Sequence, residues 1–152
     1  MLVKEIITPD QVICKADVSS KKRALELASE ILSKRQDTLN AQDIFESFLS
    51  REKLGSTAIG YGVALPHGRL KQTEETTGVF LLLDKGVDFD ADDKVPVDLV
   101  FAMLVPEQST EEHLKLLAQL AEMFSNENFR ESLRNADDSQ TIYNLIINSS
   151  TQ

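Results

Sequence analysis

The stretch Val97-Asp-Leu-Val-Phe-Ala-Met-Leu-Val105 is a nearly continuous apolar run that lies between Pro96 and Pro106. Runs of this kind lack the polar–apolar alternation of a half-buried strand and are typical of strands covered on both faces. The flanking prolines limit its length, because proline lacks the N–H group that a central strand donates to its neighbour. We therefore predict that 97–105 is the central strand of a sheet.

The segments around this strand predict an α/β domain in which a mixed sheet of about five strands is sandwiched between helices. Further strands are expected at 11–16 and 77–83, followed by a turn at 84–86 and a polar hairpin or surface loop at 87–93. The connections between 58 and 105 are short, so part of the sheet should be antiparallel. We expect one domain over 1–152, with a core of about 5–147.

Helix starts are marked by side chains that can cap free backbone N–H groups. The first expected helix begins at Ser19 or Ser20 and ends near 35, and the second begins at Asn40 and ends at Gly55. Three more are expected to begin at the capping box Ser109-Thr-Glu-Glu112, at Asn126, and at Asp137 or Asp138. Arg51 falls in the last turn of the second helix, where a cation suits the helix dipole. The polar tail 148–152 is predicted to be frayed.

The composition is that of an ordinary globular protein, with 41% hydrophobic and 27% charged residues among 152. The net charge of −9 argues against nucleic acid as a partner; the acidity would favour a basic protein partner, or would serve solubility alone. The single cysteine, Cys14, forms no internal disulfide and is expected to be a small core residue. Without a membrane-length apolar run or a secretory signal, we expect a cytoplasmic protein that does not insert into the membrane.

A glycine-rich segment, Gly55-Ser-Thr-Ala-Ile-Gly-Tyr-Gly-Val-Ala-Leu-Pro-His-Gly-Arg69, contains one of the chain's two histidines. Four of the six glycines lie here, and glycine permits positive φ and a close approach to the backbone. Pro66 fixes its own φ and favours an extended Leu65. The segment is therefore predicted to run extended into a rigid Pro-His-Gly turn that presents His67.

The glycines do not fit the known phosphate-binding loops of nucleotide sites. Gly55 and Gly60 have the outer spacing of a P-loop, but Tyr61 and Gly62 stand where lysine and a hydroxyl residue are required. Gly60 and Gly62 could begin a dinucleotide fingerprint, but Leu65 replaces its third glycine. The chain also lacks the Gly-x-Ser-x-Gly sequence of a hydrolase nucleophile.

Metal sites are not expected either. Asp88, Asp90 and Asp92 alternate as in a calcium loop, but Asp93 replaces its glycine at the sixth position and Leu99 its acid at the twelfth. The two histidines are far apart in the sequence, and a zinc site would need more ligands at close spacing. We predict neither a metal nor a cofactor.

The chemistry left to His67 is that of a nucleophile or proton carrier. Near neutral pH an imidazole keeps a free lone pair, and it can form covalent intermediates. A histidine that accepts a phosphoryl group also needs donors and cations for the phosphoryl oxygens. The candidates for that role are Arg51, Ser56, Thr57, the amide of Gly68, and His113. Taken singly, each also has an ordinary structural interpretation: a surface or core histidine, a cation at a helix end, a strand residue, a tight turn.

The segment 55–69 resembles the active-site segment of the enzyme IIA proteins of the bacterial phosphoenolpyruvate-dependent sugar phosphotransferase system. The resemblance is to the fructose/mannitol family, and most closely to its nitrogen-regulatory branch. It extends to His113-Leu-Lys-Leu-Leu-Ala-Gln-Leu, Arg51-Glu-Lys, Thr8-Pro-Asp and Ser20-Lys-Lys-Arg-Ala-Leu, and so covers nearly the whole chain. Tyr61 departs from the pattern, because many members have asparagine or another small polar residue between the glycines. This departure bears on the rim of the site.

The resemblance implies that the chain is a phosphotransferase component with the enzyme IIA mannitol/fructose-type fold. It implies that His67 is phosphorylated on its tele nitrogen by the phosphohistidine of a small phosphocarrier protein. His113 would stabilise the phosphoryl group and Arg51 would neutralise part of its charge. Ser56, Thr57 and Gly68 would complete the phosphate contacts.

A IIA domain without IIB and IIC domains fits the nitrogen-type regulator, which resembles a signalling protein of nitrogen, potassium and carbon metabolism. Its phosphorylation state would decide whether it binds targets such as potassium-uptake and sensor-kinase systems. Two alternatives remain open. The chain could pass its phosphoryl group to a separate IIB subunit of a sugar transporter, or it could be a binding module that is never phosphorylated.

Overall fold

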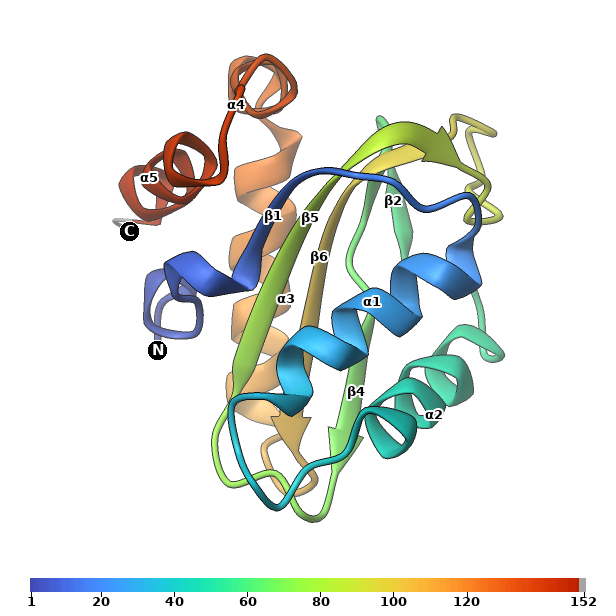
Figure 1. Ribbon diagram of the computed structural model, residues 1–152, viewed down its shortest axis with the longest axis vertical. Coiled ribbons are helices and arrows are strands. Elements are labelled where there is room, and N and C mark those ends of the chain that lie inside the picture. Colours follow the sequence, from blue (N-terminus) through green and yellow to red (C-terminus); the bar gives the residue numbers. More distant parts are fainter. Residues whose placement is uncertain (151–152) are drawn as a thin grey trace.

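The computed structural model describes residues 1–150 and contains a six-stranded mixed sheet with helices on both faces (Figure 1). Its strands are β1 (Val12–Ala16), β2 (Ala58–Gly60), β3 (Val63–Ala64), β4 (His67–Leu70), β5 (Thr77–Val87) and β6 (Val97–Pro106). The strand order is β1-β5-β6-β3-β2, and β4 pairs with β6 beyond β3. The predicted fold class is confirmed, with six strands where about five were expected.

The strand β6 is the centre of the sheet, as its apolar run predicted. It pairs antiparallel with β5 along one side. On the other side it pairs parallel, first with β3 and then with β4. The short β2–β3 hairpin and the β5–β6 pair supply the antiparallel part that the short connections required.

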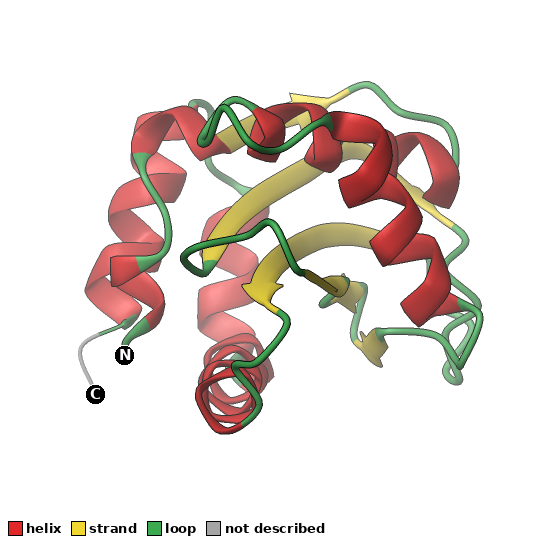
Figure 2. Cartoon of the chain, turned by 90° about the horizontal axis from the view of Figure 1, so that it is seen from below, coloured by secondary structure: helices red, strands yellow, loops and turns green. Residues whose placement is uncertain are grey.

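Helices cover both faces of the sheet, as Figure 2 shows from below. They are α1 (Lys21–Ser33), α2 (Ala41–Glu52), α3 (Glu111–Ser125), α4 (Glu127–Arg134) and α5 (Ser139–Ser149), with short 3-10 turns η1 (Val3–Glu5) and η2 (Pro9–Gln11). One core lies under α1 and α2, and the other lies under α3, α4, α5 and η1. Successive β6 side chains alternate between the two, with Phe101 and Met103 in one core and Ala102 and Leu104 in the other. Fully burying a Leu, Met or Phe side chain contributes roughly 1.5–3 kcal/mol, so both faces stabilise the fold.

The predicted N-caps are confirmed at four helices, and the one predicted for α3 is wrong. The side chains of Ser20, Asn40, Asn126 and Asp138 each accept a backbone N–H bond at the start of a helix. At α3 the capping box of 109–112 is wrong. The N-cap is Thr110, whose φ of −87° and ψ of −49° are helical, and its side chain makes no capping bond. A side-chain cap normally needs an extended residue at this position.

Three further predictions of local structure are corrected. The turn at 84–86 is wrong, because β5 continues through it to Val87, which pairs with Val97 of β6. The helix α2 ends at Glu52 rather than at Gly55. The prediction of a frayed tail is wrong for residues 148–150. The helix α5 runs to Ser149, and the hydroxyl of the buried Ser150 accepts the Lys4 N–H at 2.8 Å. The last two residues of that prediction, 151–152, lie outside the described residues.

Within residues 1–150, none of the helices combines the length and apolar character needed to cross a membrane. The same part of the chain brings together no group of three or more His, Cys, Asp or Glu side chains placed to hold a metal ion.

Candidate active site

The two histidines, 46 residues apart in the sequence, meet in one cavity of about 760 Å³. The cavity lies where α2, β4 and the first turn of α3 come together. Its lining includes Asp43, Glu46, Ser47, Ser50, Arg51, Leu54, His67, Gly68, Arg69, Leu70, Gln72, His113, Leu114 and Leu117. The rings of His67 and His113 pack edge to face, with centroids 4.9 Å apart and planes at 72°. The sequence predicted that these histidines share a site.

The position of His67 is set by strand pairing rather than by a turn. The predicted Pro-His-Gly turn is wrong, because His67 is the first residue of β4 and pairs with Met103 of β6. The Pro66 carbonyl accepts the Met103 N–H at 2.9 Å, so the ladder already begins before the histidine. The reason is the parallel edge of β6, which offers hydrogen bonds to the segment that follows the proline. His67 is therefore held by the central strand of the sheet.

The close packing of α2 on β4 brings Arg51 to His67. A Cβ atom at Gly68 would overlap the Ser47 hydroxyl and lie 3.0 Å from Ser47 Cβ. Glycine at 68 therefore lets the helix sit directly on the strand. The contact holds α2 beside β4 (Figure 1), and Arg51, in the last turn of α2, donates to His67, the first residue of β4.

The hydrogen bonds of His67 define which ring nitrogen is nucleophilic. Nδ1 lies 2.9 Å from the Leu65 carbonyl oxygen, which can only accept, so Nδ1 carries the proton. Arg51 Nε donates to Nε2 at 3.2 Å, and a guanidinium can only donate, so Nε2 has the lone pair. Arg51 also donates from Nη1 to the Gly55 carbonyl at 2.8 Å. The resemblance places the phosphoryl group on this same Nε2 atom.

The surroundings of His67 favour its neutral form. Burial lowers the pKa of His67, the nearby Arg51 and Arg69 charges lower it further, and the Leu65 carbonyl and Glu52 oppose them. The net shift is downward from the ordinary value of 6.5. At neutral pH the ring thus keeps its lone pair on Nε2.

His113 is the third residue of α3 and is only 5% exposed. Arg69 donates to its Nδ1 from Nε at 3.3 Å and from Nη2 at 3.1 Å. Its Nε2 is buried and has no hydrogen-bond partner among the described residues. Arg69 was not among the predicted site residues. The available signal was its spacing, because residues two apart on a strand point to the same side and Arg69 lies two after His67.

The free energy of unfolding should depend on pH through His113. Burial first, then the charges of His67, Arg69 and Arg51, lower the pKa of His113 from 6.5 to about 4. Because the unfolded chain binds this proton first, the stabilisation is complete above pH 6.5 and is lost as the pH falls towards 4. When the pH falls from 7.5 to 5, the free energy of unfolding of the wild type should decrease by about 2 kcal/mol more than that of His113→Gln. Urea unfolding of both proteins at the two pH values measures this difference, and equal losses would contradict the assignment.

Ser56 and Thr57 are engaged away from His67. The Ser56 hydroxyl donates to the Phe89 carbonyl, and the Thr57 hydroxyl donates to Glu52. Glu52 is itself buried and forms an ion pair with Lys21 at 2.8 Å. Neither hydroxyl residue lines the cavity, so a phosphate contact would require these hydrogen bonds to break. Gly68 does line the cavity, beside His67.

Tyr61 does not lie at the rim of this cavity, which corrects the expectation from its departure from the family pattern. It occupies the turn of the β2–β3 hairpin with a positive φ of 59°, between Gly60 and Gly62, whose φ values are also positive. Its ring stacks on Arg130, whose guanidinium carbon is 4.4 Å from the ring centroid. Its carbonyl accepts from Arg134 at 2.6 Å. Tyr61 therefore packs against α4, away from the histidines.

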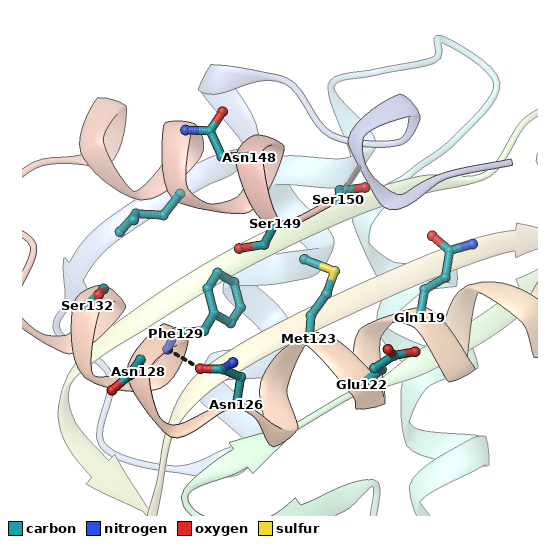
Figure 3. A pocket seen from close by; sticks show the side chains of 11 residues that line it. Gln119, Glu122, Met123, Asn126, Asn128, Phe129, Ser132, Asn148, Ser149 and Ser150 are labelled. Atoms are coloured by element: carbon teal, nitrogen blue, oxygen red, sulfur yellow. Dashed lines mark hydrogen bonds between the residues drawn. The ribbon is translucent and has the colours of Figure 1, made fainter. Parts of the chain in front are cut away.

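A second cavity of about 440 Å³ lies between α3, α4 and α5 (Figure 3). Its polar side chains are mostly amides and hydroxyls, including Asn126, which caps α4 through the Phe129 N–H at 2.9 Å. Among the described residues that line it, Glu122 alone is titratable. The lining residues that the structure describes do not pair a nucleophile with a cation, and the chemistry therefore points to the histidine cavity.

Comparison with known proteins shows the family to which the chain belongs. The family described as "Phosphoenolpyruvate-dependent sugar phosphotransferase system, EIIA 2" matches residues 5–149. The chain is 42% identical over 145 residues to the nitrogen regulatory protein of Pseudomonas aeruginosa, covering 95% of this chain and 94% of that protein. The crystal structure of the nitrogen regulatory protein IIA-Ntr from Neisseria meningitidis superposes with a TM-score of 0.89 at 40% identity, covering 95% of this chain and 98% of that one.

The fold is also that of IIA mannitol from Escherichia coli, with a TM-score of 0.78 at 22% identity over 92% of this chain and 98% of that one. The predicted resemblance to the nitrogen-regulatory branch is confirmed by the relatives at 40% identity and above. With a family match over nearly its whole length, the chain belongs to the EIIA 2 family of the phosphoenolpyruvate-dependent sugar phosphotransferase system.

Proposed function

We propose that this chain accepts a phosphoryl group on Nε2 of His67 from the phosphohistidine of a phosphocarrier protein, and that phosphorylation changes which proteins it binds. The observation that carries the proposal is the hydrogen bonding of His67. Its Nδ1 proton is held by the Leu65 carbonyl, and its Nε2 lone pair faces the Arg51 guanidinium. The nucleophile and a charge-stabilising group are thus already in contact.

The transfer step needs no proton movement between the two proteins. The bond from phosphorus to the donor nitrogen breaks as the bond from phosphorus to His67 Nε2 forms. The electron pair of the broken bond stays on the donor nitrogen. The Nδ1–H of His67 stays hydrogen-bonded to the Leu65 carbonyl, and this bond stabilises the positive charge that develops on the ring.

Arg51 and His113 fit the needs of the transferred group. Phosphoryl transfer is catalysed mainly by positioning and by stabilising charge on the equatorial oxygens. The Nε–H of Arg51, which now bonds the lone pair, would turn to a phosphoryl oxygen when Nε2 bonds phosphorus. The unpartnered Nε2–H of His113, in the same cavity, can donate to another.

The rim of the cavity fits a protein as the donor. Leu54, just after α2, is 84% exposed, and Leu114, in the first turn of α3, is 64% exposed. Both line the histidine cavity. Large exposed apolar side chains beside a reactive group are suited to a transient protein contact.

A phosphoryl group would change the charge of this docking surface. The carboxylates of Asp43 and Glu46 also line the cavity. Phosphorylation adds a charge of roughly −2, which would repel acidic partners and attract basic ones. The relatives named nitrogen regulatory proteins support such a regulatory output, with targets of the potassium-transport or sensor-kinase kind as the proposed partners.

Incubation of the purified chain with phosphoenolpyruvate, enzyme I and a histidine phosphocarrier protein tests the proposal. The intact mass should rise by about 80 Da, one phosphoryl unit, with an acid-labile bond. His67→Gln should not acquire the mass, whereas His113→Gln should acquire it slowly and still on His67. A wild type that never gains the mass would exclude phosphotransfer and favour the unphosphorylated binding module. Onward transfer to an added IIB protein would favour the sugar-transport alternative.

A further inference from the structure

The proposed transfer depends on His113 presenting an N–H, and a neutral imidazole has only one. Two N–H groups of Arg69, from Nε and Nη2, point at Nδ1 of His113, at 3.3 and 3.1 Å. Because a guanidinium cannot accept a hydrogen bond, Nδ1 must carry a lone pair. The single ring proton is therefore on Nε2. A 180° flip of the ring would break both hydrogen bonds from Arg69.

The proton on Nε2 has no acceptor in the described part of the chain, although the side chain is 95% buried. A buried donor without a partner lowers the stability of the fold, so folded proteins rarely leave one. His113 lines the same cavity as His67, where a phosphoryl oxygen would supply the missing acceptor. The unsatisfied group is thus explained by a ligand that arrives with the reaction.

We propose that Arg69 is a positioning residue for phosphoryl transfer, which holds His113 in the one orientation and tautomer that directs an N–H at the phosphoryl group on His67. The inference rests on the proposed function and adds to it a residue that touches neither reacting nitrogen. The place of Arg69 in β4 explains how it can do so. It pairs with Val105 of β6, so the same strand fixes both His67 and the group that orients His113.

A competing role for Arg69 is that of an exposed cation that attracts the donor protein. The two roles differ in kinetics. Loss of a positioning residue lowers the maximal rate of transfer at saturating donor, whereas loss of a docking charge raises the donor concentration needed for half of that rate. They also differ at His113, because a docking charge would leave its tautomer unchanged.

The test compares wild type, Arg69→Met, Arg69→Lys and the control Lys71→Met, which removes a nearby exposed cation. Nitrogen-15 NMR of the histidine rings reports the tautomer and pKa of His113, and single-turnover phosphorylation gives the two rate parameters. In Arg69→Met we expect mixed tautomers, a raised His113 pKa, and a maximal rate lower by about ten-fold or more. Arg69→Lys should recover part of the rate, because its ammonium can still donate to Nδ1.

Two results would overturn the positioning role: wild-type His113 signals in Arg69→Met, or altered signals with an unchanged maximal rate. A change in half-saturation alone, shared with Lys71→Met, would assign Arg69 to docking. Thermal unfolding identifies any loss of folding. Failure of the proposed function is distinguishable, because the wild type itself would then take no phosphoryl group, and the NMR comparison would still show whether Arg69 orients His113.

Discussion

Replacing Arg51 by methionine should slow phosphorylation of His67 by about 10²- to 10³-fold, the usual effect of removing one donor that stabilises charge in a transition state. Methionine keeps much of the aliphatic length and removes the guanidinium. The side-chain hydrogen bonds of Arg51 go to His67, which lines the cavity, and to the carbonyl of the exposed Gly55. The free energy of unfolding should therefore fall by no more than about 1 kcal/mol. Single-turnover phosphorylation and urea unfolding measure the two effects.

The matched control is Lys53→Met, which removes the same charge two residues further on, from an exposed side chain. It should change the rate far less, and Arg51→Lys should give an intermediate rate because it keeps the charge but not the fork of donors. Equal slowing in Arg51→Met and Lys53→Met would show that net charge, not placement, matters. A large loss of stability in Arg51→Met would instead make the residue a structural cation at the end of α2.

The central strand was predictable because its signal is local and strong. A run from 97 to 105 with only Asp98 as a polar interruption has few positions that tolerate water, so both faces had to be covered. The helix caps at Ser20 and Asn40 were also local, since the capping bond spans only three residues. The segment carrying His67 could be identified because its glycines, proline and histidine occur at a family-specific spacing.

The errors arise where distant partners override local preference. Asp84-Lys-Gly86 has the composition of a turn, yet β5 continues through it with a register shift, because β5 pairs with β6 on both sides of it, at Leu82 and at Val87. Ser56 and Thr57 precede the histidine closely enough to suggest phosphate ligands. Their hydroxyls are instead bound by Phe89, 33 residues away, and by Glu52, whose buried charge is paired with Lys21. The Ser56–Phe89 hydrogen bond and the Lys21–Glu52 ion pair depend on how distant segments pack in three dimensions, which no local pattern encodes.

The site is assembled from elements that the sheet brings together rather than from one loop. His67 and Arg69 come from β4, Arg51 from α2 and His113 from α3. Each helix lies on a different core, so the cavity forms where the two faces of the sheet end. The position of Arg51 relative to His67 depends on how closely α2 packs on β4, and the absence of a Cβ atom at Gly68 permits that close packing.

A Gly68→Ala substitution should destabilise the fold by about 1–3 kcal/mol and also slow phosphorylation. The backbone of Gly68 has no positive φ, so alanine is tolerated by the chain itself. The added Cβ would collide with Ser47, lying 3.0 Å from its Cβ and 3.2 Å from its carbonyl carbon. The helix must then move away from β4, which takes Arg51 from His67. The rate should fall in the same variant that loses stability.

A double-mutant cycle separates this collision from any other effect of the change. Ser47→Gly removes the two side-chain atoms that the new methyl would meet and leaves the backbone carbonyl carbon at 3.2 Å, at a cost of roughly 1 kcal/mol for glycine within a helix. The double variant should be more stable than the sum of the single losses predicts, by about 1 kcal/mol or more, because contacting residues couple. Part of the phosphorylation rate should return with it, since α2 can again approach β4. Two outcomes would contradict this explanation: strictly additive losses of stability, or a phosphorylation rate that stays low when stability returns. Either would show that Gly68 contacts the phosphoryl group through its own backbone, and does not act through the packing of α2 on β4.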